Sequence, residues 1–565
     1  MTKALAKLKE DRRSPTKQVQ FGEISGKKGR AQKKRVLYDP SSVKKRTTPP
    51  PKKAKAARAL KPTADVRFAV ANDRKKGEEE VKDKENQCNV IEFMKNVADS
   101  SKNKKEMYKK TKGLLVAHGM GSGKTLTSLW VAKEYVQKGR VDFVNILAPN
   151  VSVGEFIGSF ERAGISPQLA KKIRVLTHDE FSLNRSKRDF RNCLVIVDEA
   201  HLFTKTKYDA LVKVNVPYIM LLSGTPTPNT PSEIVPLINL LCTHEKDKWT
   251  EAKWNKKTTK VGEKIRFLKD KVSVYNIGSE HNYMGKRGAL FKSANNFPGY
   301  KVTTRDVKLS QHQNDLYLDL LKRIKKESKK AAGKYPFKRR ERAIVDSKHG
   351  NKGKKGERKV TPKVARVAKD IVQEIRKTHT GKKGATGDKR EHRGRLLLYA
   401  SHKKVAKCLM KEIRSLCREG KVNSPQIALY NGDTKDDDRL AIKESFNNGE
   451  LDLLIISKAG SVGLDLQCTS KVFLYDLWWN IPQVNQIIGR AIRFRSHRKP
   501  PCEHEHVDVY IYKSTFVTKP SGKGVERVYD HQVLLDADKK WTLVADMIEN
   551  VLKPSAIKNV YSCKR

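Results

Sequence analysis

Residues 113–125 read Gly-Leu-Leu-Val-Ala-His-Gly-Met-Gly-Ser-Gly-Lys-Thr, and they decide the fold of the first half of the chain. The apolar run 114–117 is typical of a strand that is buried on both faces of a parallel sheet. A glycine-rich turn follows it and leads into a helix-like segment, 124–137. This order predicts a phosphate cradle, because successive backbone N–H groups and the N-terminus of the helix face the same point.

The residues of this cradle predict a binding site for ATP. Lys124 is expected to contact the β- and γ-phosphates, and Thr125 is expected to ligate Mg²⁺. The strict phosphate-loop pattern has glycine at position 118, where this chain has His118. The predicted ATP-binding residues of the loop are Gly119, Met120, Gly121, Ser122, Gly123, Lys124 and Thr125.

A second motif, Asp198-Glu199-Ala200-His201, follows the apolar run 194–197 and begins 74 residues after Lys124. At the carboxyl end of a parallel strand, Asp198 is suited to hold Mg²⁺ and Glu199 to orient and deprotonate the attacking water. We therefore predict that Asp198 and Glu199 are catalytic and that Thr125 and Asp198 are the metal ligands. His201 is interpreted as a contact to the γ-phosphate region or to the next motif.

Short apolar runs alternate with helix-like segments in two blocks, which predicts two tandem α/β lobes with parallel sheets. The expected strands are 114–117, 145–148, 173–176, 194–197 and 219–222 in the first block, and 396–399, 427–430, 453–456, 472–475 and 509–512 in the second. The predicted divisions are a disordered basic arm (1–80), an ATP-binding lobe (81–300), a basic helical linker or insert (301–394), a second lobe (395–515) and a C-terminal extension (516–565).

The second block contains candidate residues that would complete the ATP site from another lobe. Residues 457–466 form a glycine-rich loop after an expected strand and include Gly463. Residues 486–493 are expected to place Arg490 and Arg493 on one face of a single helix, with Gln486 preceding them. The planar guanidinium group matches the charge that develops on a transferred phosphate, so both arginines are predicted to be catalytic when the lobes close.

Positive charge is concentrated outside these motifs. The formal net charge is +57, and residues 1–70 hold 21 Lys and Arg against five Asp and Glu, while residues 322–395 hold 28 against eight. This distribution favours a polyanion partner, most naturally nucleic acid, over a tail that only aids solubility. Basic clusters such as Lys33-Lys34-Arg35 fit either nuclear targeting or phosphate contact.

The remaining composition excludes several classes. Eight cysteines are scattered without a Cys-x-x-Cys pair, which argues against a disulfide framework and for a reducing compartment. No run of eighteen apolar residues is present, so we expect no membrane association, and the N-terminus lacks the apolar core of a signal peptide.

Taken together, these stretches resemble superfamily 2 helicases, and the Swi/Snf-type branch most closely. The resemblance includes Leu222-Ser223-Gly224-Thr225-Pro226-Thr227-Pro228-Asn229, the link Val307-Lys308-Leu309-Ser310, and Leu477-Trp478-Trp479-Asn480-Ile481-Pro482 leading into 486–493. It implies two RecA-like lobes, an adenine-reading role for Gln87, and ATP-binding roles for Gln486 and Gly463. The lead-in 113–119 and the segment 548–560 are similar to helicase-like ATPases of large cytoplasmic DNA viruses, the group of the poxvirus early transcription factor small subunit and nucleoside triphosphatase I.

This resemblance implies an ATPase that uses Mg²⁺, is stimulated by nucleic acid and acts in transcription. It also implies viral RNA polymerase or transcription factor subunits as partners, and a location in the virion or the host cytoplasm, with nuclear entry as an alternative. We expect translocation on DNA rather than RNA. Two other hypotheses are an RNA helicase and a non-enzymatic scaffold for nucleic acid, and the complete set of catalytic residues argues against the scaffold.

Overall fold

The computed structural model describes residues 74–99, 106–183, 190–275, 277, 290–291, 298–328, 360–380, 395–420, 422, 425–457, 464–493, 496–497, 502, 506–517 and 528–557. The predicted disordered arm up to residue 73 lies outside the described residues, as do 329–359 and 381–394 of the predicted insert. Helix α1 (Arg74–Ala98) already occupies the last part of the segment assigned to the arm.

The first lobe contains a six-stranded sheet with the order β3-β2-β4-β5-β1-β6, and its strand pairs are parallel. Its strands are β1 (Gly113–His118), β2 (Phe143–Ala148), β3 (Ile173–Thr177), β4 (Cys193–Val197), β5 (Tyr218–Ser223) and β6 (Val272–Tyr275). The five runs predicted from the sequence all form strands. The edge strand β6 was not predicted, because a four-residue strand containing Ser273 lacks a continuous apolar run.

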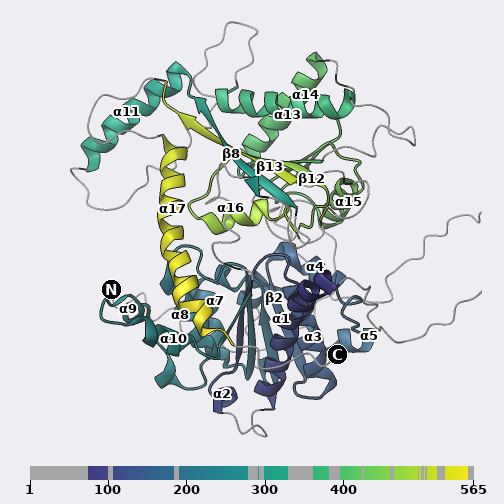
Figure 1. Cartoon of the computed structure of the whole chain (residues 1–565), viewed down its shortest axis with the longest axis vertical. Helices are drawn as coiled ribbons and strands as arrows, with labels where there is room; N and C mark the ends of the chain where they lie inside the picture. The colour runs from purple at the N-terminus through teal and green to yellow at the C-terminus, as the bar shows by residue number, and fades with distance from the viewer. Residues whose placement is uncertain are drawn as a thin grey trace, which may run out of the picture. The chain divides into compact units, whose positions relative to one another are not determined.

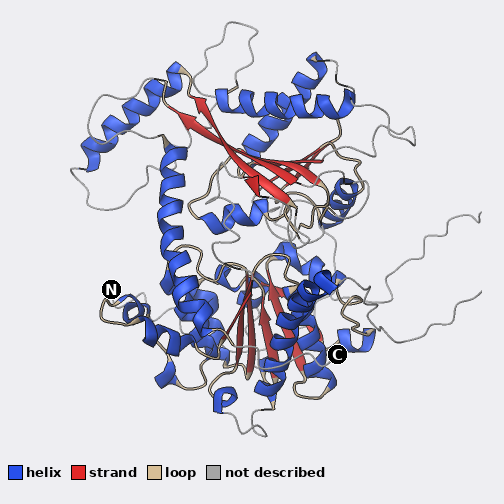
Figure 2. Cartoon of the chain, in the orientation of Figure 1, coloured by secondary structure: helices blue, strands red, loops and turns tan. Residues whose placement is uncertain are grey.

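Helices cover both faces of this sheet (Figure 2), which explains why its strands are apolar on both sides. Helices α1 and α3 (Lys124–Gln137) share an apolar cluster with one face, while α7 (Lys205–Val214), α8 (Ile234–Leu241) and α10 (Val261–Leu268) pack on the other. The shorter helices are α2 (Glu106–Lys109), η2 (Asn150–Ser152), α4 (Val153–Gly158), α5 (Pro167–Ala170), α6 (His178–Leu183), η4 (Ala200–Leu202), η5 (Pro231–Glu233), η6 (Glu245–Asp247) and α9 (Glu251–Asn255).

The second lobe contains a seven-stranded sheet with the order β10-β11-β9-β12-β13-β8-β7, in which only the described pair β7–β8 is antiparallel. Its strands are β7 (Leu290–Phe291), β8 (Gly299–Lys308), β9 (Arg395–Tyr399), β10 (Ile427–Tyr430), β11 (Leu453–Ile456), β12 (Thr469–Leu474) and β13 (His506–Thr515). The five predicted runs of this block all overlap strands. Because β8 pairs with β13 along its whole length, this lobe begins about 100 residues before the predicted boundary at 395.

Helices also cover both faces of the second sheet. Helices α13 (Pro362–Thr380) and α14 (Lys403–Glu419) pack on one face, while α11 (Gln311–Ser328), α15 (Asp436–Asn447) and α16 (Ile481–Ile488) lie on the other. The predicted helix at 361–375 is therefore part of the lobe core rather than of a linker. The periodic apolar residues of α13 are buried against the sheet.

The C-terminal segment joins the cores of both lobes (Figure 1). Tyr529, Val533 and Ala537 of α17 (Tyr529–Met547) belong to the apolar core of the second lobe, whereas Val544 and Met547 belong to that of the first. The π-helical turn η10 (Ile548–Leu552) and α18 (Lys553–Ser555) continue it on the first lobe. The predicted C-terminal extension therefore contributes apolar side chains to the cores of both lobes.

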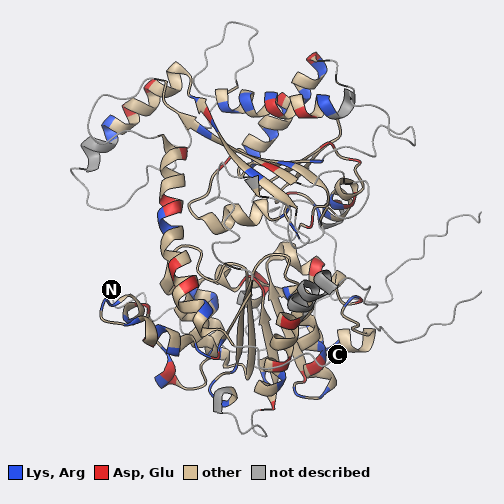
Figure 3. Cartoon of the chain, in the orientation of Figure 1, with Lys and Arg blue, Asp and Glu red and all other residues tan. Residues whose placement is uncertain are grey.

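Several cations of the basic segment 322–395 form internal contacts. Lys363 forms a buried ion pair with Asp530, and Arg395 is buried and donates to the carbonyl oxygen of Gln467 at 2.9 Å. Other basic residues of the segment, on α13, remain on the surface (Figure 3). Only part of this positive charge is thus available to a polyanion.

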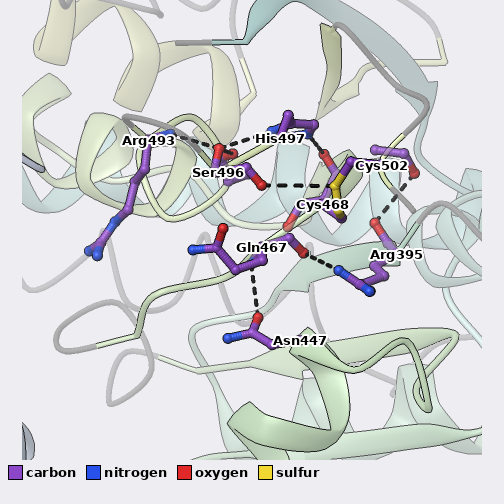
Figure 4. The surroundings of a disulfide bond; sticks show 11 residues. Arg395, Asn447, Gln467, Cys468, Arg493, Ser496, His497 and Cys502 are labelled. Atoms are coloured by element: carbon purple, nitrogen blue, oxygen red, sulfur yellow. Dashed lines mark hydrogen bonds between the residues drawn. A yellow bond between two sulfur atoms is a disulfide. The ribbon is translucent and has the colours of Figure 1, made fainter. Parts of the chain in front are cut away.

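Cys468 and Cys502 form a disulfide (Figure 4), with their Cα atoms 5.5 Å apart. Cys468 immediately precedes β12, and Cys502 lies shortly before β13. These strands are parallel neighbours, so their starting ends meet at one edge of the sheet. The scattered cysteines argued against a disulfide framework, and this pair departs from that expectation, because sequence spacing cannot show which strand ends are adjacent.

Across the described residues, no helix is long and apolar enough to cross a membrane.

Candidate active site

The phosphate loop joins β1 to α3 and needs glycine at two positions. Gly121 and Gly123 have positive φ angles of 75° and 79°, which favour glycine. A Cβ atom on Gly123 would also lie 2.4 Å from the side-chain nitrogen of Gln87. That nitrogen donates to the carbonyl oxygen of Ser122 at 3.0 Å, so α1 brings Gln87 against the loop.

Lys124 begins α3 and points back over the loop. Its Nζ donates to the carbonyl oxygens of His118 and Gly119 at 2.7 and 2.9 Å. Burial lowers the pKa of Lys124, the charges of Glu199 and Asp198 act in the opposite direction, and Arg493 and Arg490 lower it further.

His118 occupies the position where the strict phosphate-loop pattern has glycine, and its side chain packs away from the loop. The side chain is buried and its Nε2 lies 2.7 Å from the Oγ of Ser273 on β6, so it contacts the edge of the sheet. Burial, with the nearby charge of Lys124, lowers the pKa of His118 to about 3. The imidazole is therefore neutral and adds no charge beside the lysine.

Asp198 and Glu199 follow β4 directly. The backbone of Glu199 is left-handed, with φ 46° and ψ 51°, which is strained for a residue other than glycine and is typical of functional sites. Burial and the adjacent Glu199 carboxylate raise the pKa of Asp198. The Oε2 atom of Glu199 is buried and lacks a hydrogen-bond partner within the described part of the chain.

These oxygen atoms are suitable for a divalent cation and a water molecule. Mg²⁺ prefers carboxylate and hydroxyl oxygens, which Asp198 and Thr125 supply. The unsatisfied Glu199 oxygen is suited to accept a proton from water. The residues present therefore fit the predicted cofactor.

His178 supports this motif and was not found by the sequence reasoning. It begins α6 at the end of β3, and its Nε2 donates to the backbone carbonyl oxygen of Asp198 at 2.9 Å. Burial lowers its pKa to about 4. No local pattern marks this residue, because the contact arises from two strands that end at the same edge of the sheet.

His201 connects the Asp198–His201 motif to the next motif at the end of β5, which is one of the two contacts predicted for it. Its Nδ1 lies 2.9 Å from the Oγ of Ser223 and 3.4 Å from the Oε2 of Glu199. The Oγ1 of Thr225 is within 3.5 Å of the ring, and the backbone N–H of Thr225 donates to Ser223 Oγ at 3.0 Å. Hydroxyl groups at the end of β5 therefore touch the side chain next to Glu199.

The two predicted arginines lie just beyond α16 rather than on it. The helix ends at Ile488 with Gly489 as its C-cap; Arg490 follows in a turn and Arg493 lies outside regular secondary structure, so the prediction of one continuous helix was wrong. Arg490 is buried and donates to the carbonyl oxygen of Leu464 at 3.2 Å. Burial, with repulsion from Arg493, lowers the pKa of Arg490 to about 10.

Arg493 is held by its own chain and by the loop before β12. Its Nε donates to the carbonyl oxygen of Gly489 at 3.2 Å, and its guanidinium group lies 3.3 Å from Asp465. Its backbone N–H donates to Ser496 Oγ, and Ser496 accepts a hydrogen bond from the backbone of Cys468 (Figure 4). The disulfide thus lies beside the segment that contains Arg493.

The structure brings most of the predicted site residues together. The charges of both carboxylates raise the pKa of Lys124 and those of both arginines lower it, so the five groups interact electrostatically. A Cβ atom on Gly489 would lie 2.2 Å from the Cε of Met120, so the phosphate loop also touches the end of α16. Gln486 is buried on α16, while Gly463 lies outside the described residues.

Three family models match overlapping parts of the chain between residues 80 and 495. The type III restriction enzyme res subunit matches residues 80–228, the SNF2-related domain matches 167–374, and the helicase conserved C-terminal domain matches 373–495. A protein of Acanthamoeba polyphaga mimivirus, whose name proposes an ATP-dependent RNA helicase, is 24% identical over 77% of this chain and 89% of its own length. Nucleoside triphosphatase I of Amsacta moorei entomopoxvirus is 31% identical over 20% of this chain and 17% of its own length.

A solved SWI2/SNF2 ATPase core of Sulfolobus solfataricus in complex with double-stranded DNA covers 76% of this chain and 87% of its own, with 14% identity and a TM-score of 0.31, a similarity too low to bear on the fold.

This chain is an ATP-hydrolysing enzyme of superfamily 2. Its two tandem lobes with parallel sheets, its phosphate loop and its arginine-containing motif agree with the SNF2-related and helicase C-terminal matches. Within that superfamily the chain is similar to the Swi/Snf type through the SNF2-related match over 167–374, and a mimivirus helicase-like protein and an entomopoxvirus nucleoside triphosphatase I are among the proteins that it resembles.

Proposed function

We propose that this protein is a nucleic-acid-dependent ATPase that moves along DNA. The observation that supports this most strongly is that the end of α16, which leads into Arg490 and Arg493, touches the phosphate loop before Lys124. The charges of both arginines also lower the pKa of Lys124, whereas those of Asp198 and Glu199 raise it. The arginines belong to the second lobe and the other three residues to the first. Hydrolysis would then require both lobes, which is how a cycle of ATP binding can produce motion along a strand.

Each side chain has a distinct proposed role. Lys124 and the loop N–H groups bind the phosphates, and Glu199 accepts a proton from the attacking water. Arg490 and Arg493 stabilise charge that develops on the transferred phosphate. Asp198 and Thr125 would hold Mg²⁺, which neutralises phosphate charge when bound.

Surface charge supports a phosphate-rich track. Helix α14 buries Val405, Leu409 and Ile413, and its opposite face is basic. The exposed cations of this helix are Lys403, Lys404, Lys407, Lys411, Arg414 and Arg418. The predicted arm and the remaining insert would add sequence-independent affinity.

An RNA helicase is the second candidate, because the mimivirus relative carries that proposal in its name. We further propose that the protein binds subunits of a viral RNA polymerase or of a viral transcription factor. It would act in the virion or in the host cytoplasm. These follow from the viral relatives and from the resemblance to poxvirus transcription ATPases.

ATP hydrolysis measured with double-stranded DNA, single-stranded DNA and RNA tests the proposal. We expect the largest stimulation with DNA, and Lys124→Ala should lower the stimulated rate by about 10²–10³-fold, as expected for loss of a charge-stabilising donor. Lys138→Ala, at the exposed C-cap of the same helix, is the matched control and should hydrolyse ATP at the wild-type rate.

The outcomes separate the two candidates. Stimulation by RNA alone would replace the DNA translocase by the RNA helicase. A wild-type rate for Lys124→Ala would reject the proposed site.

A further inference from the structure

Two asparagines form a hydrogen bond between the lobes close to the proposed active site. Asn480 lies at the N-terminus of α16 in the second lobe, and Asn229 follows β5 in the first. The Nδ2 of Asn480 donates to the Oδ1 of Asn229 at 3.3 Å. Neither residue has a part in the roles proposed above.

The first lobe fixes the orientation of Asn229. Its Nδ2 donates to Oε1 of Glu233 at 3.0 Å, and its backbone N–H donates to Oε2 of the same carboxylate at 2.8 Å. The N–H of Thr230 also donates to Oε2, at 3.3 Å. Since the amide nitrogen is engaged with Glu233, the Oδ1 atom is presented to the second lobe as an acceptor.

The second lobe fixes Asn480 in the complementary orientation. Its Oδ1 caps α16 by accepting from the backbone N–H of Gln483 at 3.2 Å, so its Nδ2 remains as a donor. The preceding tryptophans hold this segment: the indole N–H of Trp478 donates to the hydroxyl of Tyr399, and Trp479 packs edge-on against Tyr529 of α17. Donor and acceptor therefore match without rearrangement of either side chain.

The segment 223–229 and the side chain of His201 connect Asn229 to Glu199. Between Thr225 and Asn229 the sequence is Pro226-Thr227-Pro228, and the two prolines restrict this segment. Thr225 and Ser223 contact His201, which lies 3.4 Å from Glu199 Oε2. A shift of Asn229 is thus transmitted to the side chains that pack around Glu199.

We propose that Asn229 and Asn480 are positioning residues that align Glu199 for hydrolysis when the lobes meet. They touch no reacting atom in this arrangement, and they act through the segment 223–229 and His201. The inference rests on the active site proposed above, and it adds a contact that makes water activation depend on the second lobe as well as on its arginines.

Asn480→Asp tests the pair with little change in shape. Aspartate keeps the Oδ1 acceptor that caps α16 but replaces the donor with a second acceptor facing Asn229. We expect kcat for ATP to fall by about 2- to 10-fold, the effect of one hydrogen bond, while KM for ATP stays unchanged because the phosphate loop is intact. Asn255→Asp adds the same charge at an exposed site and should keep the wild-type kcat.

A double-mutant cycle distinguishes positioning from a general structural defect. Asn480→Ser retains a capping oxygen and Asn229→Ala removes the partner acceptor; each should lower kcat, and the double variant should be no slower than the slower single variant. Rates are measured with and without DNA. Failure of DNA to stimulate the wild type would count against the proposed function alone, whereas additive single effects or a wild-type kcat for Asn480→Asp would overturn the positioning role.

Discussion

Replacement of Asp530 by alanine is expected to weaken the attachment of α17 to the second lobe by about 3–5 kcal/mol. The Oδ2 atom of Asp530 accepts hydrogen bonds from Lys363 Nζ and from the backbone N–H of Ser514, both at 2.8 Å. The side chains of Lys363 and Asp530 are only 3% and 6% exposed. The large cost follows because the ammonium group would stay buried without a counter-ion, in the first turn of α13 where the helix dipole also disfavours a cation.

Removing both charges should cost less than removing one. In the double variant Lys363→Met with Asp530→Leu, the main loss is the acceptor of the Ser514 N–H, at about 1–3 kcal/mol. Native-state hydrogen exchange of the amides in α13 and β13 measures the local opening free energy without assuming that the whole chain unfolds in one step.

Asp546→Ala, on the exposed side of α17, is the matched control and should leave this protection unchanged. Wild-type protection in Asp530→Ala would refute the reasoning about the buried charge. A double variant as unstable as Asp530→Ala would also refute it, because the cost would then come from packing.

Two further predictions concern the disulfide and a buried histidine. The Cys468–Cys502 bond spans a sequence separation of 34 residues, so its loss should lower the free energy of unfolding of the second lobe by about 4 kcal/mol, because the unfolded chain gains conformational entropy. Urea unfolding of Cys502→Ser measures this loss, and Cys408→Ser, which removes a free thiol, is the control. Equal stabilities of the two variants would contradict the prediction. Burial lowers the pKa of His178 from 6.5 to about 4. Because the unfolded chain then binds a proton that the folded chain does not, the contribution of this histidine to the free energy of unfolding should be fully present above pH 6.5 and should be lost as the pH falls towards 4. His178→Gln keeps a donor for Asp198 without titrating, so it should flatten part of this fall in Tm, and an unchanged slope would argue against the assignment.

Local pattern was sufficient to predict the strands and the phosphate loop. Continuous apolar runs such as 194–197 can be satisfied only where both faces of a strand are covered, and the predicted helix 124–137 coincides with α3. The loop glycines were predictable for the same reason, since positive φ angles at Gly121 and Gly123 exclude most side chains.

Boundaries and long-range contacts were not predictable in this way. Strand β8, which lies between β13 and the edge strand β7, mixes buried, half-buried and exposed residues, so it lacks the apolar run that identified the predicted strands. Helix α17 has two buried stretches that belong to different lobes, and no spacing in the sequence shows which core receives each stretch.

The sequence by itself determined the chemistry of this protein, because Lys124, Asp198, Glu199, Arg490 and Arg493 occur in motifs whose residue types suit ATP hydrolysis.

The tertiary structure decided which side chains support that chemistry. His178, Asn229 and Asn480 belong to the site only because strand ends and helix ends far apart in the chain meet at one edge of each sheet. The disulfide between Cys468 and Cys502 has the same origin. Motifs record local backbone requirements, whereas such contacts depend on the order of strands in a sheet, which a single sequence does not encode in any local spacing.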